Sequence, residues 1–175
     1  PGARALNSPI SSPAAIFDSD NYSAGGGFED VTLESPAFNT TGYAGVTLKW
    51  DQYFQSGFGG TAMVQVWDGT TWNTVYNNNS TTTSNPNTQT INITTLAANK
   101  TGIKVRFRWQ GDWSWFWIVD NVQVYYVVDV QPLSVDAPKT PCGASNDSVK
   151  ITVRNNSGFA VTNVPITVQI GGIGT

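Results

Sequence analysis

Short segments in which apolar and polar residues alternate constrain the fold of this chain more than any other feature. In the clearest segment, apolar residues alternate with basic ones. The apolar residues are Ile103, Val105, Phe107 and Trp109, and the basic ones are Lys104, Arg106 and Arg108. Successive side chains of a strand point to opposite faces, so this pattern predicts a half-buried β-strand. No window of roughly eleven residues has the 3.6-residue period of an amphipathic helix. The sequence therefore predicts an all-β fold.

Turn residues between these segments predict how the strands connect. Asp68-Gly69 separates Met63 to Trp67 from Trp72 to Tyr76, and Asp-Gly flanked by apolar residues predicts a hairpin. Trp117 to Val124 is largely apolar at both parities, which is typical of a central strand. We expect an antiparallel β-sandwich of the jelly-roll type.

A change of pattern near residue 127 predicts a domain boundary. Residues 14–127 form a complete set of alternating segments, and Asp129 to Lys139 forms a proline-containing bridge. The remainder holds about three expected strands, whereas an immunoglobulin-like sandwich needs about seven. We predict a jelly-roll domain over residues 1–127 and a partial, truncated Ig-like β-sandwich over residues 128–175.

Composition excludes several classes of enzyme. The sequence contains 0 His and 1 Cys, which removes the base of Ser-His-Asp and Cys-His sites and leaves no internal disulfide or multi-cysteine zinc site. Paired carboxylates, as in glycosidases, are the remaining route, but no motif supports Asp112 with Asp120 or Asp18 with Asp20 as such a pair. We predict that the chain is not an enzyme.

Charge and apolar runs limit the expected partners and location. The 9 Lys+Arg and 12 Asp+Glu give a net charge of −3, so nucleic acid is not an expected partner. The apolar runs at Trp115 to Val119 and Val124 to Val128 fall far short of the roughly 20 residues that span a bilayer, so we expect no membrane insertion. The tracts of Asn, Ser and Thr, with few charges and almost no thiol, indicate an extracellular, secreted or cell-surface protein.

One set of motifs is similar to a known family. The motifs are Leu33 to Phe38, Val46 to Asp51, Val66 to Trp72, Val105 to Arg108 and Trp113 to Val122. Together they resemble the MAM-like jelly-roll domains related to the cleaved-adhesin domains of gingipain-type surface proteins. The resemblance covers about Ala14 to Val127 and is most specific in the tryptophan-rich run that ends in Asp120-Asn121-Val122. It implies an adhesion or accessory module joined to other domains of a larger bacterial surface protein.

Three aspartates are candidate ligands for a structural calcium ion. Asp18 and Asp20 stand at i and i+2, which in an extended strand point the same way, and Asp120 shares the parity of Ile118 and Val124 on an otherwise apolar face. Oxygen clusters suit Ca2+, and the resemblance implies that Asp18, Asp20 and Asp120 hold it, with Asp51 as a weaker candidate. The competing interpretation is that Asp120 accepts backbone N–H groups or pairs with an arginine, while Asp18 and Asp20 form a solvated turn.

Aromatic and basic residues provide candidate ligand contacts. Trp113, Trp115 and Trp117 recur at period two and would line one face of a strand or its entry loop. Exposed rings there could stack on sugars, with Trp113 and Trp115 as the contacts, although burial in the core is the competing interpretation. The stripe of Lys104, Arg106 and Arg108 could recognise an anionic glycan or be a solvated face.

Two functions from different classes remain open. The first is a calcium-stabilised, non-catalytic adhesion or accessory module that binds a glycan or a surface protein. The alternative is a carbohydrate-binding module of a secreted hydrolase that uses the tryptophan loop. Cys142 either pairs with a cysteine outside this chain or is a free thiol.

Overall fold

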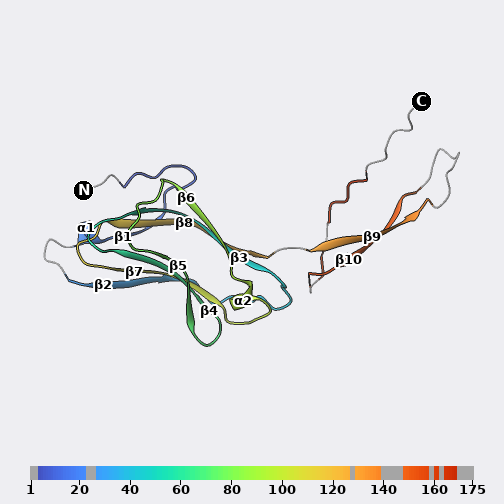
Figure 1. The fold of residues 1–175 in the computed structure, drawn as a ribbon, viewed down its shortest axis with the longest axis horizontal. Helices are drawn as coiled ribbons and strands as arrows, with labels where there is room; N and C mark the ends of the chain where they lie inside the picture. Colours follow the sequence, from blue (N-terminus) through green and yellow to red (C-terminus); the bar gives the residue numbers. More distant parts are fainter. Residues whose placement is uncertain are drawn as a thin grey trace, which may run out of the picture. The chain divides into compact units, whose positions relative to one another are not determined.

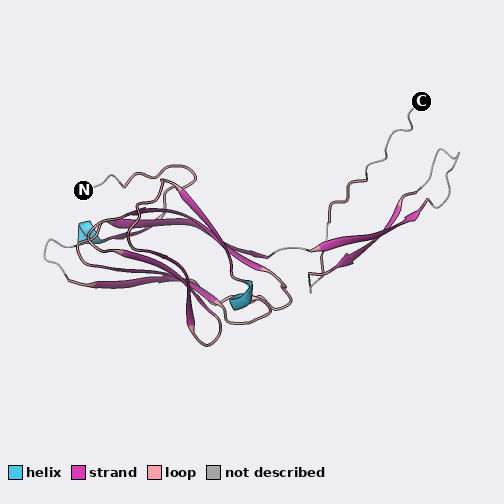
Figure 2. Cartoon of the chain, in the orientation of Figure 1, coloured by secondary structure: helices cyan, strands magenta, loops and turns pink. Residues whose placement is uncertain are grey.

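The computed structural model describes residues 4–22, 27–126, 129–138, 148–157, 160–161 and 164–168. The chain divides into two compact units, Pro1–Val127 and Val128–Thr175. Strands dominate the described residues, and two short helical turns join them (Figure 2). Neither helix is long and apolar enough to cross a membrane.

The first unit contains two layers of β-sheet (Figure 1). One sheet has the order β1-β8-β3-β6, with β1 at Ala15–Asp18, β8 at Phe116–Tyr126, β3 at Val46–Gln55 and β6 at Asn87–Asn92. The other has the order β2-β7-β4-β5, with β2 at Glu29–Glu34, β7 at Lys104–Gly111, β4 at Thr61–Trp67 and β5 at Trp72–Asn78. All pairs in both sheets are antiparallel. The first unit is therefore the predicted antiparallel jelly-roll β-sandwich.

The core lies between the two sheets and is rich in aromatic side chains. Its largest fully buried members are Trp50, Trp109, Trp117 and Phe54. Strand β7 buries every second residue, as its sequence predicts, and turns its basic residues outward. The predicted hairpin is also confirmed, because Trp67 of β4 pairs with Trp72 of β5.

The segment before β1 covers the outer face of the β1-β8-β3-β6 sheet. Ile10 is 2% exposed and packs with Phe116 and Ile118. The Asn121 side chain donates to the Pro9 carbonyl oxygen at 2.9 Å. This cover explains why outward-facing residues of the sheet are buried although they do not belong to the central core.

A register shift between β3 and β8 changes which residues of β8 share a face. Asp120 pairs with Asp51, whereas Val124 pairs with Leu48, which lies in the core. Asp51 has an odd number and Leu48 an even one, so they lie on opposite faces of β3. Asn121 has a φ of 51° at the shift, and an extra residue in one strand moves the following side chains to the other face. The expectation that Asp120 and Val124 share one face is therefore wrong.

Two short helices interrupt the strands, α1 at Ser19–Tyr22 and α2 at Thr94–Ala97. The first replaces part of the extended run expected around Asp18 and Asp20. Asp18 ends β1, and its Oδ1 accepts the Asn21 backbone N–H at 3.1 Å. A carboxylate that accepts such an N–H group acts as the N-cap of a helical turn.

The described part of the second unit is an antiparallel pair, β9 at Val130–Ala137 and β10 at Lys150–Asn155. Residues 164–168, which lie in the part of the chain where the sequence predicts about three strands, contain no strand. Cys142 lies outside the described residues. The partial Ig-like domain stays a prediction.

Candidate functional site

Exposed aromatic rings gather at one end of the sandwich, on the loops that join β3 to β4 and β7 to β8. Phe58 in the first loop is 76% exposed and Trp113 in the second is 57% exposed. Trp115 is partly buried, and its ring lies 6.4 Å from that of Phe58, centroid to centroid. We call Phe58, Trp113 and Trp115 the loop aromatic cluster.

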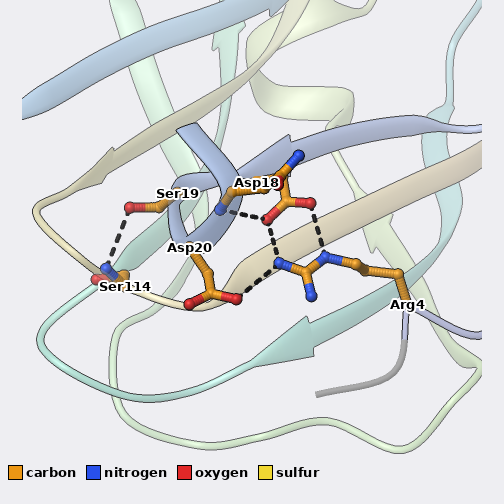
Figure 3. A network of polar contacts seen from close by, with 6 residues as sticks. Arg4, Asp18, Ser19, Asp20 and Ser114 are labelled. Atoms are coloured by element: carbon orange, nitrogen blue, oxygen red, sulfur yellow. Dashed lines mark hydrogen bonds and ion pairs between the residues drawn. The ribbon is translucent and has the colours of Figure 1, made fainter. Parts of the chain in front are cut away.

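Hydrogen bonds hold these two loops in place. Ser114 is fully buried, and its backbone N–H donates to Ser19 Oγ at 3.1 Å (Figure 3). The hydroxyl group of Ser114 donates to the Phe58 carbonyl oxygen at 3.4 Å. The Asp20 N–H also donates to the Trp115 carbonyl oxygen at 3.2 Å. The bases of the aromatic residues are therefore fixed, while the rings of Phe58 and Trp113 remain exposed.

The backbone under both exposed rings is in an unfavourable conformation. Phe58 and Trp113 each have a φ of 54°, a left-handed conformation that costs a bulky L-residue roughly 1–2 kcal/mol. Exposure of large apolar rings gives no burial energy in return. Strain of this kind is typical of ligand-binding positions, so the loop aromatic cluster is our candidate site.

The structure separates the three tryptophans that the period-two pattern groups together. Trp113 and Trp115 precede β8, which begins at Phe116, and Trp117 is fully buried in the core. Sequence reasoning missed Phe58. The signal available was Gly57-Phe58-Gly59-Gly60, since a large ring between glycines favours an exposed turn position.

The structure brings Asp18 and Asp20 together around a cation of the chain itself. The Arg4 guanidinium donates to Asp18 at 2.6 and 2.5 Å and to Asp20 at 2.9 Å (Figure 3). These hydrogen bonds raise the pKa of Arg4 above its ordinary value. The two carboxylates thus share one guanidinium as an ion-pair partner, whereas the competing interpretation placed them in a solvated turn.

Asp120 does not join Asp18 and Asp20. Asp18 pairs with Phe116, while Asp120 lies beyond Val119, the partner of Ala15, which is on the order of 13 Å along the strand at about 3.3 Å per residue. Within the described residues, no three or more His, Cys, Asp or Glu side chains gather in a group that could hold a metal ion. The three-aspartate arrangement predicted from sequence is therefore corrected.

Asp120 and Asp51 belong to a separate polar cluster under the N-terminal segment. Asp120 accepts the backbone N–H groups of Ser11 at 2.9 Å and Asn121 at 2.7 Å. Asp51 is 4% exposed and accepts hydrogen bonds from the side chains of Thr88 at 2.5 Å and Asn121 at 2.9 Å. These contacts agree with the competing interpretation, in which Asp120 accepts backbone N–H groups.

Calcium binding itself stays a prediction, and the Arg4 ion pair gives it a sharper test. If calcium binds Asp18 and Asp20, the guanidinium must leave, so Arg4→Gln is expected to increase the calcium-induced rise in melting temperature. A ligand at about 100 times its Kd stabilises the folded state by roughly 2.7 kcal/mol. Melting curves with calcium and with chelator measure this effect. Indifference of both the wild type and Arg4→Gln would contradict the calcium prediction.

The fold and the site define an all-β jelly-roll domain with an aromatic surface on its loops. No family model and no curated protein matches the chain. Among solved structures it is similar to TmCBM61, a carbohydrate-binding module in complex with β-1,4-galactotriose. The identity is 15%, the match covers 65% of this chain and 70% of that chain, and the TM-score is 0.45. A likeness at this level assigns no ligand to the chain.

Proposed function

We propose that the chain is a non-catalytic carbohydrate-binding module whose ligand stacks on the loop aromatic cluster. The observation that carries this proposal is the pair of exposed rings, Phe58 and Trp113, held on anchored loops with a φ of 54° at each. Rigid rings lose little conformational freedom when a ligand packs against them. The apolar C–H face of a pyranose is a ligand of matching shape and polarity.

Polar groups beside the rings support a saccharide in preference to a purely apolar partner. Asp112 is exposed next to Trp113, and its Oδ1 accepts the Gly27 N–H at 3.4 Å. Gln55 ends β3 beside the other loop, and its side-chain N–H groups donate weakly to Ser56 and Thr82, at 3.5 and 3.4 Å. Its Oε1 accepts the Tyr53 hydroxyl at 3.0 Å. Apolar faces with a few polar groups at their edge are typical of small-molecule and sugar sites.

The family, the location and the parent protein of this module are also part of the proposal. The resemblance to MAM-like adhesin domains, the extracellular location and the larger parent protein are predictions that an adhesion module and a hydrolase accessory module share. A glycan array separates these two functions, because only the carbohydrate-binding function requires saccharide selectivity.

Trp113→Ala is expected to weaken saccharide binding about 30-fold, because loss of a central stacking ring costs about 2 kcal/mol. Titration calorimetry with an oligosaccharide selected on the array measures the change, and Phe58→Ala should show a similar loss. Tyr125→Ala is the matched control, since Tyr125 is a 40% exposed ring near the other end of β8. Equal affinity of Trp113→Ala and the wild type, or no bound saccharide at all, would overturn the proposal.

A further inference from the structure

The outer face of the β2-β7-β4-β5 sheet carries the basic stripe predicted from β7, and the structure divides its members. Arg108 donates to both carboxylate oxygens of Asp30, at 2.7 and 2.5 Å. Lys104 donates to Glu34 at 2.7 Å. These pairs lie at the exposed edge strand β2 and fit the interpretation as a solvated face.

Arg106 lies between these pairs and differs from both. Its Nε donates to Gln65 Oε1 at 2.7 Å, and its Cζ lies 4.1 Å from the centroid of the Trp72 ring. The ion pairs found among the described residues involve Arg4, Lys104 and Arg108, and none includes Arg106. The guanidinium is thus positioned by neutral groups and has no carboxylate partner in this part of the chain.

The supports of Arg106 are themselves fixed. Gln65 is 7% exposed, and its amide donates to Thr74 Oγ1 at 2.9 Å. Trp72 pairs in register with Trp67, and their rings lie 5.6 Å apart at an angle of 54°. An arginine on a fixed aromatic face keeps its outer N–H donors in the fork geometry that matches an anionic group.

Local charges leave Arg106 incompletely neutralised. Desolvation and the nearby positive charge of Arg108 lower the pKa of Arg106 from its ordinary value, against smaller opposing effects of Glu34 and Asp30. Arginine remains charged at neutral pH after such a shift. Asp68, in the turn after Trp67, is occupied by the N–H groups of Thr70 and Thr71 at 2.8 and 2.9 Å. An arriving anion would therefore gain a partly desolvated cation as its partner.

We propose that Arg106, Trp72 and Trp67 form a second ligand site that takes an acidic saccharide. The anionic group binds the outer N–H donors of Arg106, and the sugar ring packs against Trp67. A uronic acid carboxylate and a sulfate ester share this chemistry. The aromatic pair favours a saccharide over an acidic peptide. Arg106 by itself, in a chain of net charge −3, does not provide the several phosphate contacts of nucleic-acid binding.

The test is titration of the full chain with an oligogalacturonate, a sulfated oligosaccharide, a neutral oligosaccharide and a poly-glutamate peptide. The wild type should bind one or both acidic saccharides, and the affinity should fall as salt is added. Arg106→Gln should weaken this binding at least tenfold, and Arg106→Lys less so, because the charge remains without the fork. Trp67→Ala should weaken it as well.

Arg108→Gln is the matched control, since Arg108 lies on the same strand and the same face but is paired with Asp30. It should retain acidic-saccharide binding within about threefold, and melting curves should show that each variant is folded. Equal losses of acidic-saccharide affinity in the Arg106 and Arg108 variants would show that binding depends on the charge of the whole face and not on a site at Arg106. Tighter binding of the peptide would overturn the ligand class, and absence of acidic-saccharide binding would overturn the site.

The two proposed sites fail independently. Trp113→Ala should leave acidic-saccharide binding unchanged, and Arg106→Gln should leave neutral saccharide binding at the loop aromatic cluster unchanged. A loss of acidic-saccharide binding in Trp113→Ala would assign that ligand to the loops and overturn the second site.

Discussion

Replacement of Gln52 by leucine is expected to lower the free energy of unfolding by about 3 to 5 kcal/mol. Gln52 is fully buried, and its Oε1 accepts the indole N–H groups of Trp50 at 3.1 Å and Trp117 at 3.0 Å. Leucine fills a similar volume but leaves both donors unpaired in the core. Each buried polar group without a partner costs roughly 1–3 kcal/mol.

The amide nitrogen of Gln52 extends this effect. It donates to the Tyr76 hydroxyl at 2.8 Å and to Asn87 Oδ1 at 3.0 Å, so one side chain links β3 to β5, β6 and β8. Urea unfolding measures the change, with Gln55→Leu as the control on the same strand, because Gln55 is only partly buried. A Gln52→Leu variant within about 1 kcal/mol of the wild type would contradict the importance we assign to this network.

Gly60→Ala is expected to lower the free energy of unfolding by about 2 to 3 kcal/mol, as overpacking of a tight contact does. A Cβ atom at Gly60 would lie 2.7 Å from Ser114 Cβ and 2.8 Å from Trp109 Cη2. Neither neighbour can move freely, since both are buried and Trp109 Nε1 donates to Glu29 at 2.9 Å. The loop that carries Trp113 would therefore have to shift.

The same substitution should weaken saccharide binding, because Gly60 and Ser114 join the two loops of the aromatic cluster. Thermal melting and titration calorimetry on one preparation measure both effects. Gly27→Ala is the matched control, since a Cβ atom there meets nothing within 4 Å. Wild-type stability and affinity in Gly60→Ala would show that the loops adapt without cost and would weaken the case for a preorganised cluster.

Local patterns predicted much of the sandwich. The alternation in β7 and the Asp-Gly turn between β4 and β5 depend on neighbouring residues, so the sequence predicts them correctly. Trp113, one of the two candidate sugar contacts predicted from the sequence, is 57% exposed. Periodicity failed where the backbone departs from a regular strand, at the shift beside Asn121 and at the start of β8 after Trp115.

The sequence by itself determined the class of fold, because burial of alternate side chains is a property of each strand. Only the tertiary structure decided which partners the functional side chains have. Arg4 reaches Asp18 across 14 positions, and Arg106 reaches Gln65 across 41. No local pattern encodes such pairs, since they depend on strand order and on loops that meet at one end of the sandwich. For the same physical reason, two chemically similar arginines of β7 have different environments: one pairs with an edge-strand carboxylate, and the other stacks on a tryptophan of β5.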